Sequence, residues 1–470
     1  MSGPRRRTRS GVLSAPPQVV AVEFDSSRPD SRRPVVSYRV LGQDEGLVPQ
    51  NSWNRVKRFQ PSMSAFVRRT FLPTGYPSSV RKEYMEYQTW DTVQALCSYL
   101  RGVLCLTAML HASGVGDENA SAIAAAMVWV LRDGFGMIGS LLFSYAASSH
   151  MDSNIKEWRL FADIANDVGL TLDLVAPVFR GNFAVVSSLA TVFKARPDAL
   201  CGVAAGCTKT SITSHFALKQ NMADISAKEN AQETAVNVCG MLLGVKVASY
   251  LSDAPTGRVL IFVFFSLLHV YANYRYMSST HLLPCVSALH LDTLNKQRAM
   301  LLVRSFVAGR HEEMRPELIS VKERVWIPLK LWWRYKLLGG RLASLAQDRS
   351  SLLQLKEVYG EERFMAAMSP SGCLSVVLNS AATPEDMLKA YFLCVVFWEK
   401  AALLKGVDVR DCLERERCLS LLTESHRFTQ EKFGEFVFSL RRNGWDVDHP
   451  LLGFGPWRCD WELSKGAKDE

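Results

Sequence analysis

Two groups of charged and amide side chains in this sequence are of the types that hold a polar ligand. In KEWRLFADIANDVG (156–169), four polar residues are spaced i, i+4, i+7 and i+8, which is one face of a helix. A second group lies in NMADISAKENAQET (221–234), directly before an apolar run. Inside an apolar bundle such side chains would face inward and line a polar cavity. The nine candidate residues are Arg159, Asp163, Asn166, Asp167, Asn221, Asp224, Lys228, Gln232 and Glu233.

Each group also has a purely structural interpretation. The first could be the solvated face of an amphipathic helix, with an Arg159–Asp163 ion pair one turn apart. In the second, Ser226 and Glu229 form an S-x-x-E capping box, which predicts a helix start there. Capping leaves the other polar residues of the second group without a structural role. The sequence therefore predicts a helix start with more polar residues than capping requires.

The glycine-rich and cysteine patterns predict neither a nucleotide site nor a metal site. Gly134–Gly139 reads G-x-G-x-x-G, but the residues before it look helical, so close helix packing is the better explanation. Gly202–Thr210 has the wrong spacing for a phosphate-binding loop. The 11 cysteines are scattered without a C-x-x-C pair, which argues against a disulfide framework and a structural zinc. We expect no catalytic residues and no metal ligands.

The elements that must position the two groups are helices. Apolar helical patterns run from Thr92 to about Leu291, with breaks expected at residues 114–117, 152–154, Pro177 and Pro255. Several stretches lack charge for 14 to 18 residues but fall short of the about 20 that a spanning helix needs. Two interpretations therefore remain. The helices could be the buried core of a large bundle, or they could form a membrane-embedded bundle of short helices. The composition favours membrane association.

We expect a mainly α protein whose apolar helical bundle is followed by a small α+β region. Residues 1–70 form a basic, mostly disordered arm, residues 71–310 the helical domain, and residues 311–470 the α+β C-terminal region. In the last region we expect two short strands around 369–372, a helix capped at Thr383, a helix that ends at Asn443-Gly444, and a final strand.

The distribution of charge excludes one class of partner for the body. Of the net charge of +9, residues 1–70 carry +8, since they hold 13 Arg and Lys against 5 acids. The remaining residues are close to neutral, so the body is not a nucleic-acid binder. The first residues have the composition of a mitochondrial or plastid transit segment, and a disordered basic tail is the alternative. We expect an intracellular membrane location.

From Phe71 to Tyr274 the chain carries seven motifs in order: FLPTGYPSSV, YQTWDTVQAL, GVGDENA, RDGFGMIG, KEWRLFADIANDVG, NMADISAKENAQET and HVYANYR. With these motifs it resembles the root UVB-sensitive (RUS) family. The resemblance implies links to UV-B responses, vitamin B6 homeostasis, development and auxin transport, and implies no settled biochemical activity. Lys209 stands where the family has Arg, and Glu229-Asn230 where it has Asp-Gly or Asp-Ser; both keep the local chemistry.

Three functions are consistent with these observations. The leading hypothesis is a non-enzymatic, membrane-associated helical protein that binds, moves or supports the homeostasis of a small metabolite. The alternative is a protein-interaction scaffold without a ligand. A third, suggested only by the family's vitamin B6 link, is a pyridoxal-phosphate enzyme with Lys228 as the Schiff-base lysine and Asp224 or Asp167 as its partner. The sequence requires no cofactor, and a second copy or another family member is an expected partner.

Overall fold

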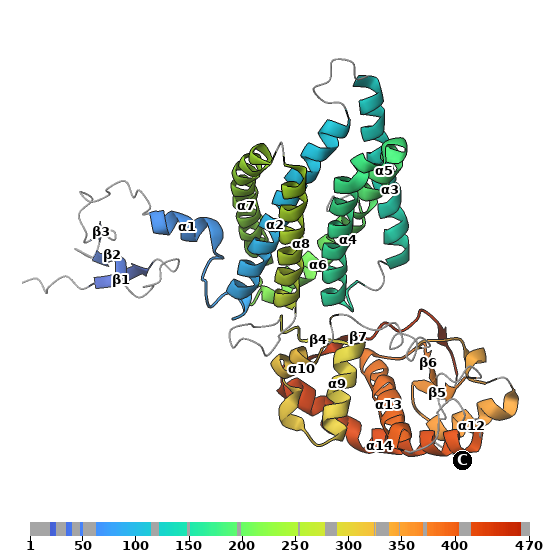
Figure 1. Ribbon diagram of the computed structural model, residues 1–470. Helices are drawn as coiled ribbons and strands as arrows, with labels where there is room; N and C mark the ends of the chain where they lie inside the picture. Colours follow the sequence, from blue (N-terminus) through green and yellow to red (C-terminus); the bar gives the residue numbers. More distant parts are fainter. Residues whose placement is uncertain are drawn as a thin grey trace, which may run out of the picture. The chain divides into compact units, whose positions relative to one another are not determined.

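The computed structural model describes most of the chain after residue 62 and three short strands before it (Figure 1). The described residues divide into two compact units, residues 1–81 with 217–231, and residues 82–216 with 232–470. The described ranges are 19–24, 34–39, 48–49, 63–113, 122–147, 151–194, 199–251, 254–277, 289–323, 325, 338–346, 348–369, 374–403 and 415–461.

The first unit combines a small antiparallel sheet, one short helix and residues 217–231, which include the first turns of a long helix. Strands β1 (Val19–Phe24), β2 (Pro34–Arg39) and β3 (Val48–Pro49) pair in the order β1-β2-β3. Helix α1 (Met63–Phe71) leads into the FLPTGYPSSV segment. The disorder expected for residues 1–70 concerns mostly residues that lie outside the described ranges.

The helical bundle of the second unit follows the predicted pattern of breaks. Helix α4 begins directly after the predicted break at 152–154, a 3₁₀ turn (Ala176–Val178) contains Pro177, and α8 begins at Pro255. The break expected at 114–117 lies outside the described residues. The helices are α2 (Tyr84–Ala112), α3 (Ala122–Ala147), α4 (Ile155–Val175), α5 (Phe183–Phe193), α6 (Leu200–Phe216), α7 (Met222–Tyr250) and α8 (Pro255–Met277).

Glycines allow several of these helices to pack closely. A Cβ at Gly139 of α3 would lie 2.7 Å from the side chain of Val192 in α5, and one at Gly240 of α7 would lie 2.8 Å from the Tyr99 ring in α2. Such distances exclude any larger residue unless the partner shifts. Of the G-x-G-x-x-G sequence, Gly139 therefore lies at a close helix contact, as predicted, whereas an added Cβ at Gly134 would have nothing within 4 Å.

The outer faces of α3, α7 and α8 are apolar and exposed. Among the described residues, three helical segments are long and apolar enough to cross a membrane, namely Tyr84–Ala112, Ala126–Tyr145 and Thr256–Asn273. An exposed apolar area of this extent is unusual for a soluble monomer. Large exposed side chains on α3 and α8 include Met127, Val130, Phe135, Ile138, Leu141, Leu142, Leu260, Phe264 and Leu267.

The region after residue 290 is an α+β body, and the fold class predicted from the sequence is confirmed. Strands β5 (Phe364–Met368) and β6 (Leu374–Asn379) are antiparallel, and β8 (Arg458–Cys459) pairs parallel to β6. Strand β4 (Thr293–Asn295) pairs parallel with β7 (Asp446–Leu451). The helices are α9 (Lys296–Val307), α10 (Pro316–Lys322), α12 (Arg349–Tyr359), α13 (Pro384–Leu403) and α14 (Arg415–Arg442).

The turn and cap chemistry predicted for this region is also confirmed. Helix α13 begins at Pro384, and the hydroxyl of Thr383 accepts a hydrogen bond from the Asp386 N–H at 3.3 Å. The Asp386 carboxylate accepts one from the Thr383 N–H at 2.8 Å, which completes a reciprocal cap. Helix α14 ends before Gly444, whose φ of +82° is a left-handed conformation that glycine adopts without strain.

One predicted cap is wrong. Helix α7 begins at Met222, about one turn before the expected start at Ser226, so Ser226 and Glu229 lie inside the helix. Asp224 occupies the first turn instead, where a carboxylate favours the positive end of the helix dipole. The S-x-x-E pattern marked a helix start nearby but misplaced it by four residues.

Candidate functional site

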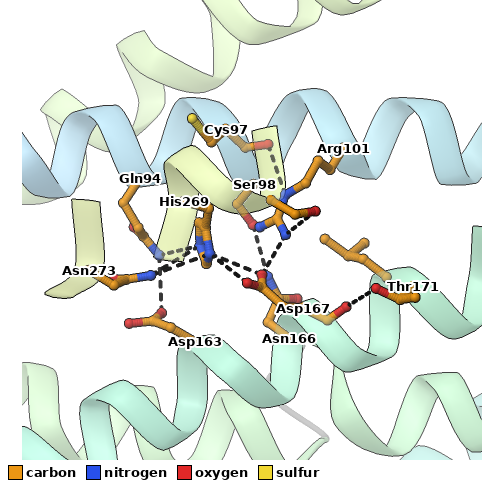
Figure 2. A network of polar contacts seen from close by, with 12 residues as sticks. Gln94, Cys97, Ser98, Arg101, Asp163, Asn166, Asp167, Thr171, His269 and Asn273 are labelled. Atoms are coloured by element: carbon orange, nitrogen blue, oxygen red, sulfur yellow. Dashed lines mark hydrogen bonds and ion pairs between the residues drawn. The ribbon is translucent and has the colours of Figure 1, made fainter. Parts of the chain in front are cut away.

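Helix α4 carries the acidic side chains of a buried polar network (Figure 2). Asp167 accepts a hydrogen bond at 2.5 Å from Nη1 of Arg101 in α2, whose side chain is fully buried. The Arg101 Nε donates to the carbonyl of Cys97, and its Nη1 lies 3.3 Å from the Ser266 hydroxyl of α8. One guanidinium therefore joins three helices in the interior of the bundle.

His269 of α8 extends this ion pair into a chain of hydrogen bonds. Its ring is fully buried, and Nδ1 lies 2.9 Å from Oδ1 of Asp167. On the other side of the ring, Nε2 lies 3.1 Å from Nε2 of Gln94 in α2 (Figure 2). The Gln94 amide nitrogen is a donor, so in this orientation Nε2 of His269 is the acceptor and Nδ1 is the atom that faces the Asp167 carboxylate.

The chain continues from Gln94 to the first group of sequence candidates. The Gln94 amide donates to Asp163 at 3.0 Å, and Asp163 lies 3.6 Å from Nε of Arg159. Arg159 also donates to Asp91 of α2 at 3.2 Å. Asn166 belongs to the same helix face and donates to the Ser98 hydroxyl at 2.9 Å. All four α4 candidates thus contact α2.

The network is close to electrical balance but not fully paired. Three carboxylates (Asp91, Asp163, Asp167) face two guanidiniums, which leaves one formal negative charge when His269 is neutral. Within the described residues, Nη2 of Arg101 is a buried donor without a hydrogen-bond acceptor. Buried polar atoms of this kind are costly unless something satisfies them. The Arg101 Nη2 is therefore a buried donor that an additional acceptor would satisfy.

A second ion cluster lies further along α4. Asp173 is fully buried and accepts two hydrogen bonds from Arg132 of α3, at 3.1 and 3.2 Å. Lys194, just after α5, forms an ion pair with the same carboxylate. Because Asp167 and Asp173 of α4 are each paired with an arginine from a neighbouring helix, α4 is the polar centre of an otherwise apolar bundle.

Three residues of the second sequence group lie in the other compact unit. The Asp224 carboxylate accepts a hydrogen bond from the Thr74 N–H at 2.7 Å, and Lys228 donates to the Arg69 carbonyl at 2.6 Å. The Asn221 side chain accepts from the Lys219 N–H at 3.2 Å. These contacts hold the FLPTGYPSSV segment against the first turns of α7, so the Lys228 amine already has a backbone partner.

The other two residues of the second group lie in the same unit as the α4 network. Glu233 forms a half-exposed ion pair with Lys209 of α6 at 3.1 Å. Both residues interact electrostatically with the Asp91 carboxylate of the network. Gln232 precedes it in α7. Exposed pairs of this kind contribute little stability.

Four central members of the network were missed in the sequence analysis. They are Gln94, Arg101, His269 and Asn273, the last of which lies 3.3 Å from the His269 ring (Figure 2). Arg101 carried a usable signal, because an arginine within a long apolar stretch is rare and faces a bundle interior. The described residues contain no group of three or more His, Cys, Asp or Glu side chains that could hold a metal ion.

Comparisons with known proteins cover nearly the whole described chain. A family model described as the vitamin B6 photo-protection and homoeostasis domain matches residues 57–310, and one described as the root UVB sensitive protein C-terminal domain matches residues 314–461. No solved structure matches the chain.

Relatives from plants and an amoeba match the chain over long stretches. The protein root UVB sensitive 3 of Arabidopsis thaliana is 35% identical over 412 residues, which are 84% of this chain and 86% of that protein. The RUS family member 1 of Dictyostelium discoideum is 41% identical over 263 residues, or 55% of this chain and 47% of that protein. The protein root UVB sensitive 2, chloroplastic, of Arabidopsis thaliana is 28% identical over 94% of this chain and 95% of that protein.

Proposed function

Since the chain belongs to the root UVB-sensitive family and carries its vitamin B6 photo-protection and homoeostasis domain, we propose that it is a non-enzymatic membrane-spanning protein that binds and moves a small polar metabolite of the vitamin B6 group. The metabolite would be held at the network of α2, α4 and α8, and the apolar faces of α3, α7 and α8 would contact lipid.

One observation carries this proposal: Arg101, Asp167 and His269 are joined inside a bundle whose outer surface is apolar. Two of these residues lie on helices that are long and apolar enough to cross a membrane. Placing an arginine at the centre of such a segment costs about 2.5–3.5 kcal/mol on insertion scales. Ionisable residues inside membrane helices commonly mark substrate or ion pathways, which supports a binding role for this network.

The chemistry of the network suits vitamin B6 compounds. These carry a hydroxypyridine ring with hydroxymethyl or amine substituents, so they both donate and accept hydrogen bonds. The carboxylates of Asp163 and Asp167 would accept from hydroxyl or ammonium groups, and the Arg101 guanidinium would donate to the oxygen of the hydroxyl group on the ring.

We place the protein in an intracellular membrane, mitochondrial or plastid, and we propose a second family member or a second copy as its partner. A relative named chloroplastic supports the organelle proposal. Fractionation of cells that express the full-length chain, followed by crosslinking in the membrane fraction, tests both. Recovery in the cytosol, or of uncrosslinked monomer alone, would contradict them.

The test begins with alkaline carbonate extraction of membranes that contain the full-length chain. We expect the protein to stay in the pellet. The purified protein is then reconstituted into liposomes, and uptake of labelled pyridoxine is measured for the wild type, His269→Gln and His449→Gln. His449 is an exposed histidine of the C-terminal region and serves as the matched control.

We expect uptake by the wild type and by His449→Gln, and a loss of at least tenfold in His269→Gln. Release of the protein by carbonate would contradict the membrane proposal. Retention in the pellet without pyridoxine uptake or binding would contradict the metabolite proposal and favour an interaction scaffold.

A further inference from the structure

A third buried charge cluster joins the two regions that the family models match. Lys156, in the first turn of α4, donates from Nζ to Glu323 at 2.6 Å and to the Ser320 hydroxyl at 2.9 Å. Glu323 follows α10, and Arg298 of α9 lies 2.9 Å from its other oxygen. The side chains of Lys156 and Glu323 are fully buried, and that of Arg298 is 2% exposed.

Glu157 lies next to this cluster without a hydrogen-bond donor. Both of its carboxylate oxygens are buried, and no hydrogen-bond partner reaches either of them among the described residues. An ionised carboxylate in such a place is strongly disfavoured, because nothing replaces the water it has lost. The neighbouring Glu323 differs, because Lys156 and Arg298 contact its carboxylate and compensate its negative charge.

The electrostatics of the two glutamates differ accordingly. Burial, together with the nearby Glu323 carboxylate, raises the pKa of Glu157 to about 7, although the backbone N–H of Glu157 itself, Arg298 and Lys156 oppose the rise. Burial alone would raise the pKa of Glu323, but Arg298 and Lys156 lower it to about 2. At neutral pH, Glu323 is therefore ionised while Glu157 lies between its two protonation states.

We propose that Glu157 is a proton-binding site whose occupancy sets how firmly the first turn of α4 is held to Ser320 and Glu323. With Glu157 protonated, the cluster keeps its ion pairs and buries no uncompensated carboxylate. When the proton leaves, a bare carboxylate without a donor remains in the contact, and hydration favours opening. Helix α4 also carries Asp163 and Asp167 of the polar network. Proton binding at Glu157 therefore affects how firmly the helix that carries these two residues is held.

The direction of the pH dependence separates Glu157 from its neighbours. In the closed contact the first turn of α4 is bonded to Ser320 and Glu323, and in the open contact these bonds are broken. Because the pKa of Glu157 is raised in the closed contact, the closed contact binds more protons than the open one. The stability of the closed contact therefore falls as pH rises from about 4.5 through about 7. Burial lowers the pKa of Lys156, and burial also lowers the pKa of His290 nearby. Either of those groups would make stability rise with pH in its own window. Of these groups, only Glu157 therefore makes the stability of the closed contact fall as pH rises through neutrality.

Hydrogen exchange of the full-length protein in lipid nanodiscs tests the proposal. Protection factors are measured between pH 6 and pH 8 for residues 155–160 and 316–322. A pKa of about 7 in the closed contact and 4.5 in the open one gives an about tenfold loss of protection over this range. Glu157→Gln should show no such loss, while Glu312→Gln, at an exposed glutamate before α10, should behave as the wild type.

Each alternative result overturns the proposal. A wild-type protection that is flat or rises with pH would show that Glu157 does not titrate in the contact. A tenfold loss that persists in Glu157→Gln would assign it to another group. If Glu157→Gln does not fold, Glu157→Ala serves the same purpose, and the wild-type profile alone can still contradict the proposal. No ligand is needed, so the result is independent of metabolite transport.

Discussion

At the scale of single residues, the bundle depends on buried ion pairs whose partners cannot be removed one at a time. Arg101 is fully buried and bonds Asp167 at 2.5 Å. If one partner is removed, the other is left as an uncompensated charge inside the bundle, which is far more costly than the loss of an exposed pair.

Arg101→Met should therefore lower the free energy of unfolding by about 3–5 kcal/mol. The matched control is Arg304→Met, which breaks a 2.6 Å pair with Glu399 whose side chains are 43% and 32% exposed. That loss should be about 0–1 kcal/mol. Thermal unfolding of both variants in detergent measures the difference. Similar losses in the two variants would mean that Arg101 is more hydrated than its burial indicates.

At the scale of elements, α4 is held in place by close packing as well as by charge. A Cβ at Gly169 would lie 2.8 Å from the Ala190 carbonyl oxygen and 3.0 Å from the Lys194 backbone nitrogen, both at α5. Backbone atoms cannot move aside as a flexible side chain can.

Gly169→Ala should destabilise the protein by about 1–3 kcal/mol, because it forces α4 and α5 apart. Gly206→Ala in α6 is the control, since nothing lies within 4 Å of its added Cβ. In a helix interior that change should be neutral or stabilise by about 0.5–1 kcal/mol. Thermal melts of both variants check the prediction, and a neutral Gly169→Ala would refute the close approach of the two helices.

At the scale of the whole molecule, the exposed apolar side chains differ in what surrounds them. Ile138 on α3 is 58% exposed and lies in a segment long and apolar enough to cross a membrane. Leu353 on α12 is 55% exposed and belongs to the α+β region. Only the first should face lipid if the protein spans a membrane as proposed.

Ile138→Asp should reduce the fraction of protein that resists carbonate extraction, because an acidic residue near the centre of a span costs about 2.5–3.5 kcal/mol. Leu353→Asp should leave that fraction unchanged. Quantitative blotting of pellet and supernatant gives the measurement. Equal effects of the two substitutions would show that α3 does not contact the bilayer core.

The arrangement of the candidate site was only partly predictable. The period of 3.6 residues places Arg159, Asp163, Asn166 and Asp167 on one face of a helix, and the structure places them there. The same local pattern misplaced the start of α7, since Asp224 rather than Ser226 occupies its first turn. Local patterns also could not identify Gln94 of α2 and His269 of α8. In the sequence they lie 69 and 106 residues from Asp163, and only folding brings them to the same network.

By itself, the sequence determined the family, the mainly α class, the position of most helix breaks and the turns of the C-terminal region. These follow from local periodicity, from proline and glycine, and from motifs that are contiguous in the chain. Only the tertiary structure decided which charges meet. Arg101 and Asp167 are 66 residues apart, and Lys156 and Glu323 are 167 apart. Such pairs form because a buried charge requires a partner, and which partner it finds depends on how the helices pack.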